Sequence, residues 1–207
     1  MKATERTAVA VPTRTVHPVY LLLDVSGSTV RDGYIDHLNQ AMPLIVDEVA
    51  HRERDSRPHY LSVSTFASES QTLITLDDPT RIEHIPALRA GGLGLLSSGL
   101  TLLGVAIEQD ALQAVADRME RRAAARIVIL TDGMPVDSSE SLIATWRQLR
   151  SRTRELLGEV VILVVNDLVR ADLAALGARI SYLTPVDLSA SVLSSAVLEC
   201  AFSANRP

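Results

Sequence analysis

Three apolar runs of strand length recur along the chain, and segments with helical patterns separate them. The runs are Val19–Asp24, Ala125–Asp132 and Glu159–Asp167, and in each of them the apolar residues follow one another without alternation. Strands that are buried on both faces of a parallel sheet have this composition, whereas half-exposed strands alternate apolar and polar positions. The runs therefore predict three central strands of a mostly parallel sheet.

Apolar residues at helical spacing predict a helix after each of these strands. In residues 34–52 the apolar positions share one face, and Pro43 is expected to kink this helix or weaken its first half. Ser138 or Ser139 is a suitable N-terminal cap for a helix over residues 139–157. Further helices are expected over residues 102–120, 189–202 and, as a short segment that ends at Gly177, 169–177.

The remaining strands are expected at the margins of the sheet. Tyr60–Ala67 alternates apolar and polar residues, and Gln71–Leu76 follows after a short turn, so the two predict a hairpin whose second strand is an edge strand. Residues 179–184 predict a last strand. Since strands alternate with helices, we expect an α/β, doubly wound (Rossmann-like) fold, with a mostly parallel sheet, one antiparallel edge strand and helices on both faces.

Length and composition suit one domain. The chain has 207 residues, and aromatic residues make up only 3% of it, so Val, Leu, Ile and Ala must build the core. Residues 1–17 are polar and are interrupted by Thr and Pro. They predict a flexible N-terminal tail that precedes a single domain of residues 18–207.

Charge and cysteine content narrow the possible partners. The formal net charge is -5, whereas nucleic-acid-binding surfaces carry a basic excess, and the Arg-rich segment Asp117–Arg126 is interpreted as a solvated helix end. Cys200 is the single cysteine, so no disulfide can form within the chain. The N-terminus lacks the apolar core of a signal peptide, and no run approaches the roughly 20 apolar residues that span a bilayer. We expect a cytoplasmic protein with no nucleic-acid or membrane partner.

Candidate chemistry gathers where two of the buried strands end. Asp24 and Asp132 end their strands, and ligands of doubly wound sheets bind outside the carboxyl ends of strands. After Asp24 the D-x-S-x-S spacing adds the hydroxyls of Ser26 and Ser28, and Gly27 permits a tight turn. Paired carboxylates with hydroxyls form a hard-oxygen set that suits Mg²⁺, Mn²⁺ or Ca²⁺. The alternative is structural: Asp24 caps the following helix, and the serines satisfy loop amides.

The stretches "DVSGS" and "TDG", with a threonine after a Gly-rich loop between them, resemble the metal-ion-dependent adhesion site of von Willebrand factor A domains. The segments "PVYLLLDVSGS", "LSVSTFASES", "GLTLLGVAIE", "ILTDGMPVD" and "ADLAALG" further resemble the TerY-like group of bacterial tellurium-resistance proteins, in the same order. The resemblance covers most of the chain from about Pro18 onward.

This resemblance implies a ligand set and a role. It implies that the cation, most often Mg²⁺, is held by hydroxyl oxygens and by two carboxylates. The hydroxyls are those of Ser26, Ser28 and Thr101, and the carboxylates of Asp24 and Asp132 ligate directly or through water. Thr29, Ser97 and Ser98 are alternatives to Thr101. One coordination position is then left for water or for an acidic side chain of a partner protein. The TerY-like group also implies a protein kinase or phosphatase component as partner, in a stress-response system.

These residues are compatible with three classes of function. A metal-dependent protein-interaction module is favoured over a Mg²⁺-dependent phosphoryl-transfer or hydrolytic enzyme, because Ser26 stands where a D-x-D-x-[TV] phosphotransferase has its acid. There is also no G-x-S-x-G elbow, and no lysine occurs after Lys2. A metal-free scaffold is the third class. We expect no enzymatic activity.

The roles of several other segments and polar residues are also addressed by the sequence. The Gly-rich segment Arg89–Gly104 predicts a flexible loop, and its glycines fit neither a dinucleotide fingerprint nor a P-loop. Asn166, Asp167 and Asp137 are either contacts at the rim of the site or turn residues. The five histidines fall in the expected tail, helix or loops and are interpreted as surface residues: His17, His37, His51, His59 and His84.

Overall fold

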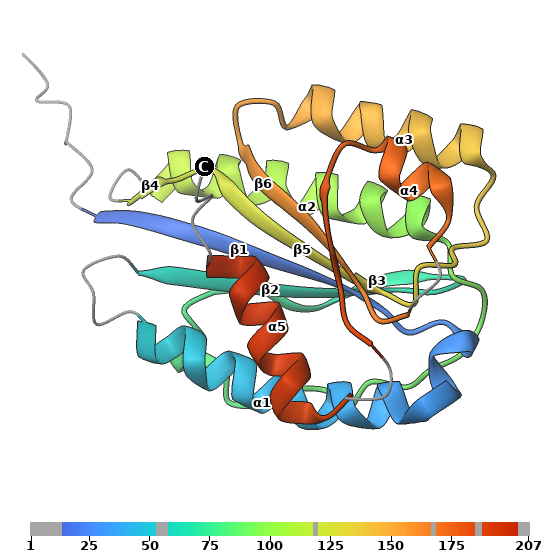
Figure 1. Ribbon diagram of the computed structural model, residues 1–207. Helices are drawn as coiled ribbons and strands as arrows, with labels where there is room; N and C mark the ends of the chain where they lie inside the picture. The colour runs from blue at the N-terminus through green and yellow to red at the C-terminus, as the bar shows by residue number, and fades with distance from the viewer. Residues whose placement is uncertain (1–13, 53–57, 118–119, 167–168, 185–187, 203–207) are drawn as a thin grey trace, which may run out of the picture.

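The computed structural model describes residues 14–52, 58–117, 120–166, 169–184 and 188–202, and they form one sheet between two layers of helices (Figure 1). Six strands lie in the order β3-β2-β1-β5-β6-β7, and the short β4 pairs with β1 outside this path. The strands are β1 (Arg14–Asp24), β2 (His59–Phe66), β3 (Ser70–Asp77), β4 (Glu120–Arg122), β5 (Ala125–Thr131), β6 (Leu157–Val164) and β7 (Arg179–Tyr182).

The pairing of the strands confirms the expected fold class. β1 lies between β2 and β5 and is parallel to both, and β5, β6 and β7 continue the sheet in parallel. β3 pairs antiparallel with β2 at one edge, as the alternation in the hairpin predicts. The chain runs from β1 to one side of the sheet and returns to β5 on the other side, so the strand order reverses between these neighbours. That reversal is where doubly wound sheets bind ligands.

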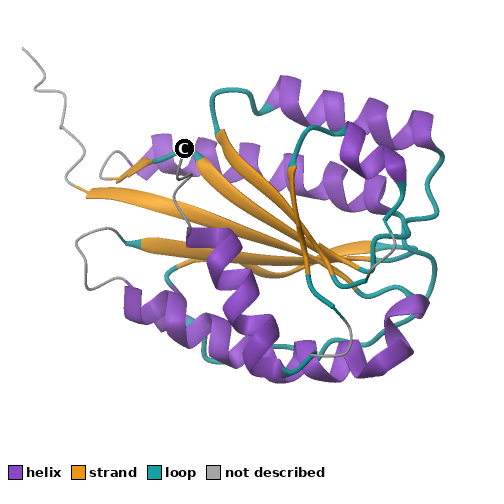
Figure 2. Cartoon of the chain, viewed as in Figure 1, coloured by secondary structure: helices purple, strands orange, loops and turns teal. Residues whose placement is uncertain are grey.

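Helices cover both faces of the sheet (Figures 1 and 2). One face packs on α1 (Tyr34–His51) and α5 (Ala190–Phe202), and Val19, Leu21 and Leu23 of β1 point to it. The other face packs on α2 (Leu96–Asp117), α3 (Ser139–Arg152) and α4 (Ala171–Ala175), and Tyr20 and Leu22 point to it. Because side chains alternate across a strand, one unbroken apolar run serves both cores.

Several boundaries differ from the expectation. β1 begins at Arg14, so residues 14–17 belong to the sheet and not to the tail, because Arg14, Thr15 and Val16 pair with β4. The Arg-rich segment is therefore not a helix end: α2 stops at Asp117, and residues 120–122 form β4. α1 runs through Pro43 without a break. Ser138 caps α3, and its Oγ accepts the Ser141 N–H at 3.2 Å. No helix within the described residues is long and apolar enough to cross a membrane.

Candidate metal centre

The candidate site lies at the carboxyl edge of the sheet, on the right in Figure 1, where β1 and β5 end side by side. Leu23 of β1 pairs with Leu130 of β5. Asp24 is the last residue of β1 and Asp132 comes directly after β5, so the two acids lie at the ends of neighbouring strands. The predicted convergence of the two acids therefore agrees with the sheet order. Ser26 and Ser28 come from the loop that leaves β1, the latter in the 3₁₀ helix Gly27–Gly33 before α1.

Asp24 is held rigidly at the base of this edge. Its side chain is only 1% exposed; Oδ1 accepts the Ser26 N–H at 2.9 Å, and Oδ2 accepts the Thr131 hydroxyl at 2.8 Å. Burial raises the pKa of Asp24, the hydrogen bonds from Ser26 lower it, and the nearby charge of Asp132 raises it further. Ionising this carboxylate thus costs free energy that a bound cation would offset.

The two serine hydroxyls face one another. Ser26 Oγ and Ser28 Oγ are 3.0 Å apart, and Ser26 is 3% exposed whereas Ser28 is exposed. Adjacent ligands of an octahedral Mg²⁺ ion, with bonds of about 2.0–2.1 Å, lie about 2.9 Å apart. Thr29 is buried and donates its hydroxyl to Ser26 O at 2.6 Å, which closes the turn. The hydroxyl pair therefore has a spacing that one cation can bridge.

Asp132 is partly exposed and lies on a tight turn after β5. Its Oδ1 accepts the Met134 N–H at 3.0 Å, and Gly133 N–H donates to Thr131 Oγ1 at 3.1 Å. Gly133 has φ 85°, a left-handed conformation that costs side-chain-bearing residues free energy. The T-D-G sequence thus turns the chain so that the threonine anchors Asp24 while the aspartate remains accessible.

The Gly-rich segment forms the third wall of the site. Gly91 N–H donates to Val25 O at 2.8 Å, and Gly27 N–H donates to Gly92 O at 2.9 Å. A Cβ built on Gly94 would lie 3.3 Å from Ser26 Oγ and 3.9 Å from Asp24 Oδ1. Position 94 therefore faces the candidate ligands from the second loop, but it offers no side-chain oxygen.

The structure places Thr101 in α2, and no hydrogen bond among the described residues joins it to the other four predicted ligands. The Gly-rich loop is shorter than predicted, because α2 already begins at Leu96. Thr101 lies in the second turn of this helix with an exposed side chain. Its hydroxyl donates to Ser97 O at 2.9 Å within the helix. The alternatives are engaged elsewhere: Ser97 Oγ bonds Asp137, Ser98 Oγ bonds Ser70, and Thr29 closes the first loop.

Asp137 caps α2 from the third loop. Only 6% of it is exposed; Oδ2 accepts the Leu96 N–H at 2.7 Å, and Oδ1 accepts the Ser97 N–H at 3.1 Å. Val136 N–H also donates to Gly94 O at 2.9 Å, and Arg170 donates to Asp137 O at 2.7 Å. Asp137 is therefore neither a ligand nor a simple turn residue; it fixes the second loop against the third.

Other polar residues singled out from the sequence follow β6 or lie at the start of β1 and β2. Asn166 follows β6, and Asp167 lies outside the described residues. His17 and His59 are not surface residues of a tail or loop: they pair in register in β1 and β2, with ring centroids 5.5 Å apart. They lie where these strands begin, at the opposite end of the sheet from Asp24. Within the described residues, no cluster of three or more His, Cys, Asp or Glu side chains offers another kind of metal site.

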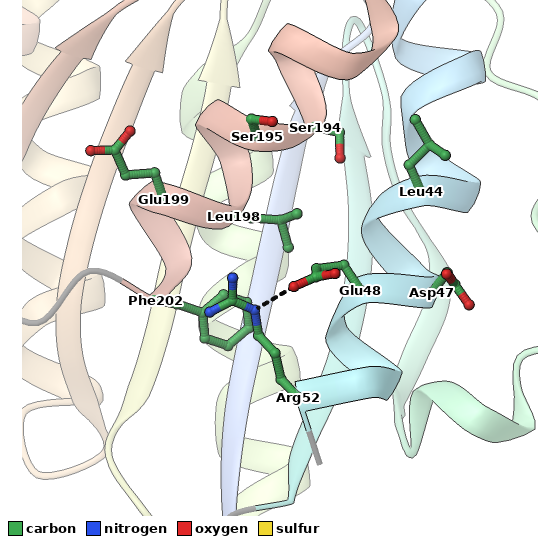
Figure 3. Close-up of a pocket in the computed structure, with 9 residues that line it drawn as sticks. All are labelled: Leu44, Asp47, Glu48, Arg52, Ser194, Ser195, Leu198, Glu199 and Phe202. Carbon is green, nitrogen blue, oxygen red and sulfur yellow. Dashed lines mark hydrogen bonds and ion pairs between the residues drawn. The ribbon is translucent and has the colours of Figure 1, made fainter. Parts of the chain in front are cut away.

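A surface groove of about 620 Å³ lies between α1 and α5, away from the candidate ligands (Figure 3). Its residues come from the second half of α1, from the residue directly after α1, and from α5: Leu44, Asp47, Glu48, Arg52, Ser194, Ser195, Leu198, Glu199 and Phe202. Arg52 Cζ lies 4.5 Å from the centroid of the Phe202 ring, and Arg52 Nε donates a hydrogen bond to Glu48 Oε1 at 3.2 Å. This groove therefore does not coincide with the polar centre at the strand ends.

The sequence profile of the von Willebrand factor type A domain matches residues 19–177. The chain belongs to this family. A search of curated proteins finds no match. Among solved structures, a von Willebrand factor type A protein from Catenulispora acidiphila aligns with a TM-score of 0.64 at 12% identity, over 90% of this chain and 43% of that one.

Two further solved structures share the fold. The ArnB paralog VWA2 from Sulfolobus acidocaldarius aligns with a TM-score of 0.59 at 14% identity, over 88% of this chain and 44% of that one. The PilB minor pilin from Streptococcus sanguinis aligns with a TM-score of 0.58 at 14% identity, over 94% of this chain and 64% of that one. This von Willebrand factor A domain thus spans less than half the length of the first two proteins, and the likeness concerns the fold alone.

The residues of this domain suit a hard divalent cation. Two carboxylates and two hydroxyls at bridging distance offer the oxygen ligands that Mg²⁺ and Mn²⁺ prefer. The set leaves out a hydroxyl from the second loop, because Gly94 stands at the position that faces the others. Such a centre would keep several waters in its coordination shell, and the ion would supply a positive charge that attracts anionic groups.

Proposed function

We propose that the domain is a cation-dependent protein-binding module. Asp24, Ser26, Ser28 and Asp132 hold a divalent cation, with the carboxylates acting directly or through water, and Mg²⁺ is the first choice, with Mn²⁺ or Ca²⁺ as alternatives. The convergence of these four side chains where β1 and β5 end carries the proposal. One coordination position accepts an acidic side chain of a partner, which replaces water.

Exposed apolar side chains on the same three loops support a protein partner. Val30 is 60% exposed beside the serines, Leu93 is 58% exposed in the Gly-rich loop, and Met134 and Val136 are 47% and 53% exposed after Asp132. Backbone hydrogen bonds tie these loops together, so the apolar groups lie on the same loops as the charged centre. A free anion would need only the charge, whereas a protein surface can cover the apolar rim as well.

Binding, and not catalysis, is the proposed activity. Ser26 occupies the position where an aspartyl phosphotransferase carries its general acid, and a hydroxyl cannot perform that step near neutral pH. Asp24 accepts two hydrogen bonds and is nearly inaccessible, which suits a fixed ligand better than an attacking nucleophile.

The TerY-like resemblance supplies a more specific proposal. Under it, the partner is a protein kinase or phosphatase component of a bacterial stress-response system, in the cytoplasm, and a link to tellurium resistance is part of the same expectation. The order of the resembling segments along the sequence is its support. The partner's contact would be an acidic residue with apolar neighbours, which matches the charge and the rim described above.

Affinity capture from the native lysate tests the binding proposal. The immobilised protein is incubated with Mg²⁺ or with EDTA, beside an Asp24→Asn variant and an Asp36→Asn control on the exposed face of α1. We expect partners that require both the cation and Asp24. Retention of the same proteins in EDTA and by Asp24→Asn would refute a metal bridge.

Rim variants test the apolar part of the surface separately. Val136→Ser and Leu93→Ser should weaken capture of the same partner while Mg²⁺ affinity stays unchanged. Leu112→Ser is the matched control, because Leu112 is 71% exposed but lies about 24 Å along α2 from its first residue. Equal losses in all three variants would argue against a specific rim.

A further inference from the structure

Tyr34 has a buried hydroxyl without a hydrogen-bond partner among the described residues. Its side chain is 4% exposed, and it is the first residue of α1, directly after the 3₁₀ helix that carries Ser28. A buried tyrosine hydroxyl normally finds a partner, since leaving it unpaired costs free energy. An orphan hydroxyl in a well-packed core therefore indicates a group that the protein side chains do not supply.

The charged groups that act on this hydroxyl belong to the candidate metal centre. Burial raises the pKa of Tyr34 well above its usual range, and the charges of Asp24 and Asp132 raise it further. The hydroxyl is therefore neutral and can both donate and accept a hydrogen bond. Neither carboxylate makes a hydrogen bond with it. Buried polar groups that lack a direct hydrogen bond are commonly bridged by water.

We propose that Tyr34 is an outer-sphere residue of the cation site, whose hydroxyl hydrogen-bonds a water held by the cation and its carboxylates. The proposal rests on the proposed function, because it needs a cation between Asp24 and Asp132. Tyr34 touches no partner and ligates no metal; it positions a water molecule of the coordination shell.

The composition of the second loop gives this role a physical reason. Gly94 faces Ser26 and Asp24 without a side chain, so water must fill a position that a hydroxyl side chain would otherwise take. Mg²⁺ demands near-ideal octahedral geometry, and its waters are oriented by protein groups in the second layer. Tyr34 is a buried group near both carboxylates with hydrogen-bonding capacity to spare.

A pair of tyrosine variants tests the proposal. Tyr34→Phe removes the orphan hydroxyl, and Tyr20→Phe removes a buried hydroxyl that donates to Asp110 Oδ2 at 2.8 Å, about 13 Å along β1 from Asp24. Mg²⁺ affinity is measured by titration calorimetry, and the cation-free fold is measured by urea unfolding. We expect Tyr34→Phe to weaken Mg²⁺ binding about 10-fold while its cation-free urea midpoint stays equal or rises.

Tyr20→Phe should show the opposite pattern, with a lower urea midpoint and wild-type Mg²⁺ affinity, because its hydroxyl is bonded and remote. If the wild type binds Mg²⁺ and Tyr34→Phe binds it equally well, the role of Tyr34 is refuted and the metal site stands. If the wild type binds neither Mg²⁺ nor Mn²⁺, the proposed function and this inference fail together. A fall in the cation-free midpoint of Tyr34→Phe would also contradict an unpaired hydroxyl.

Discussion

Replacing Asp137 with alanine tests how the three loops of the site are held in place. Asp137 lies on the loop after β5, yet its carboxylate accepts hydrogen bonds from Leu96 N–H, Ser97 N–H and Ser97 Oγ at the start of α2. The Asp137→Ala variant leaves the N-terminus of α2 without its cap. The buried Leu96 N–H, which donates at 2.7 Å, then has no acceptor.

The expected cost follows from these contacts. Loss of an N-terminal cap costs about 1 kcal/mol, and a buried unsatisfied N–H costs about 1–3 kcal/mol. Loss of a negative charge at the helix N-terminus adds about 0.3–1 kcal/mol. Since Ser97 is partly exposed and water can reach it, we expect a total of about 3 kcal/mol. For a chain of this size that lowers Tm by roughly 6–12 °C.

Urea unfolding, followed by circular dichroism, measures this loss against a matched cap. Ser138→Ala removes the exposed, local cap of α3, whose Oγ accepts the Ser141 N–H at 3.2 Å, and should cost about 0.5–1 kcal/mol. Asp137→Asn keeps one carbonyl oxygen as an acceptor, so its loss of stability should lie between the losses of Asp137→Ala and Ser138→Ala. If Asp137→Ala costs no more than Ser138→Ala, the buried contact between the loops does not hold α2 as described.

Three further variants follow from the same geometry. In the cation-free protein, Asp24→Asn should raise the free energy of unfolding at neutral pH, since burial raises the pKa of Asp24 and its ionised form is disfavoured in the fold. In the wild type, the contribution of Asp24 to stability is therefore fully present below the usual carboxyl pKa and is lost as pH rises through the raised pKa. The difference between the urea midpoints of the wild type and Asp24→Asn across the acid-to-neutral range checks both statements. Gly133→Ala forces a side chain into φ 85° and should cost about 1–2 kcal/mol in the same assay. Gly94→Ser should bind Mg²⁺ several-fold more tightly than Gly94→Ala in calorimetry, because both add a Cβ but only serine adds an oxygen beside Ser26; equal affinities would show that position 94 does not face the cation.

The central strands could be predicted because burial on both faces leaves a direct record in the residue pattern. The side chains from Val19 to Leu23 pack alternately into the two cores. A strand with no polar face must be buried on both sides, which places it in the middle of a covered sheet. The β2–β3 hairpin was also readable from the alternation in residues 60–67 and the short turn after it, although the polar positions of β2 are buried: Ser62 Oγ donates to Ile74 O, and Ser64 Oγ bonds Thr72 Oγ1 of β3. By contrast, β4 is a three-residue, Arg-rich strand that exists only because β1 begins early enough to pair with it.

The part of the candidate site that the sequence places in one turn is also brought together in the structure. Asp24, Ser26 and Ser28 occupy one turn, and the hydrogen bonds within that turn depend on local spacing. The second loop was mispredicted because its conformation is decided by Asp137, an acceptor 41 positions along the chain from Leu96. That cap starts α2 before Thr101 and leaves Gly94 facing the centre. Tyr34 escaped notice for a similar reason: its spacing marks it as a core residue, and only the fold shows that its hydroxyl has no partner.

Titration calorimetry of the wild type and Asp24→Asn with Mg²⁺ tests the central claim most directly, with Asp36→Asn as the control for a lost surface charge. The account predicts a single weak binding event in the wild type and in Asp36→Asn, and none in Asp24→Asn although that variant is folded. Absence of binding in the wild type with Mg²⁺ and Mn²⁺ at millimolar concentration, or undiminished binding by Asp24→Asn, would contradict it.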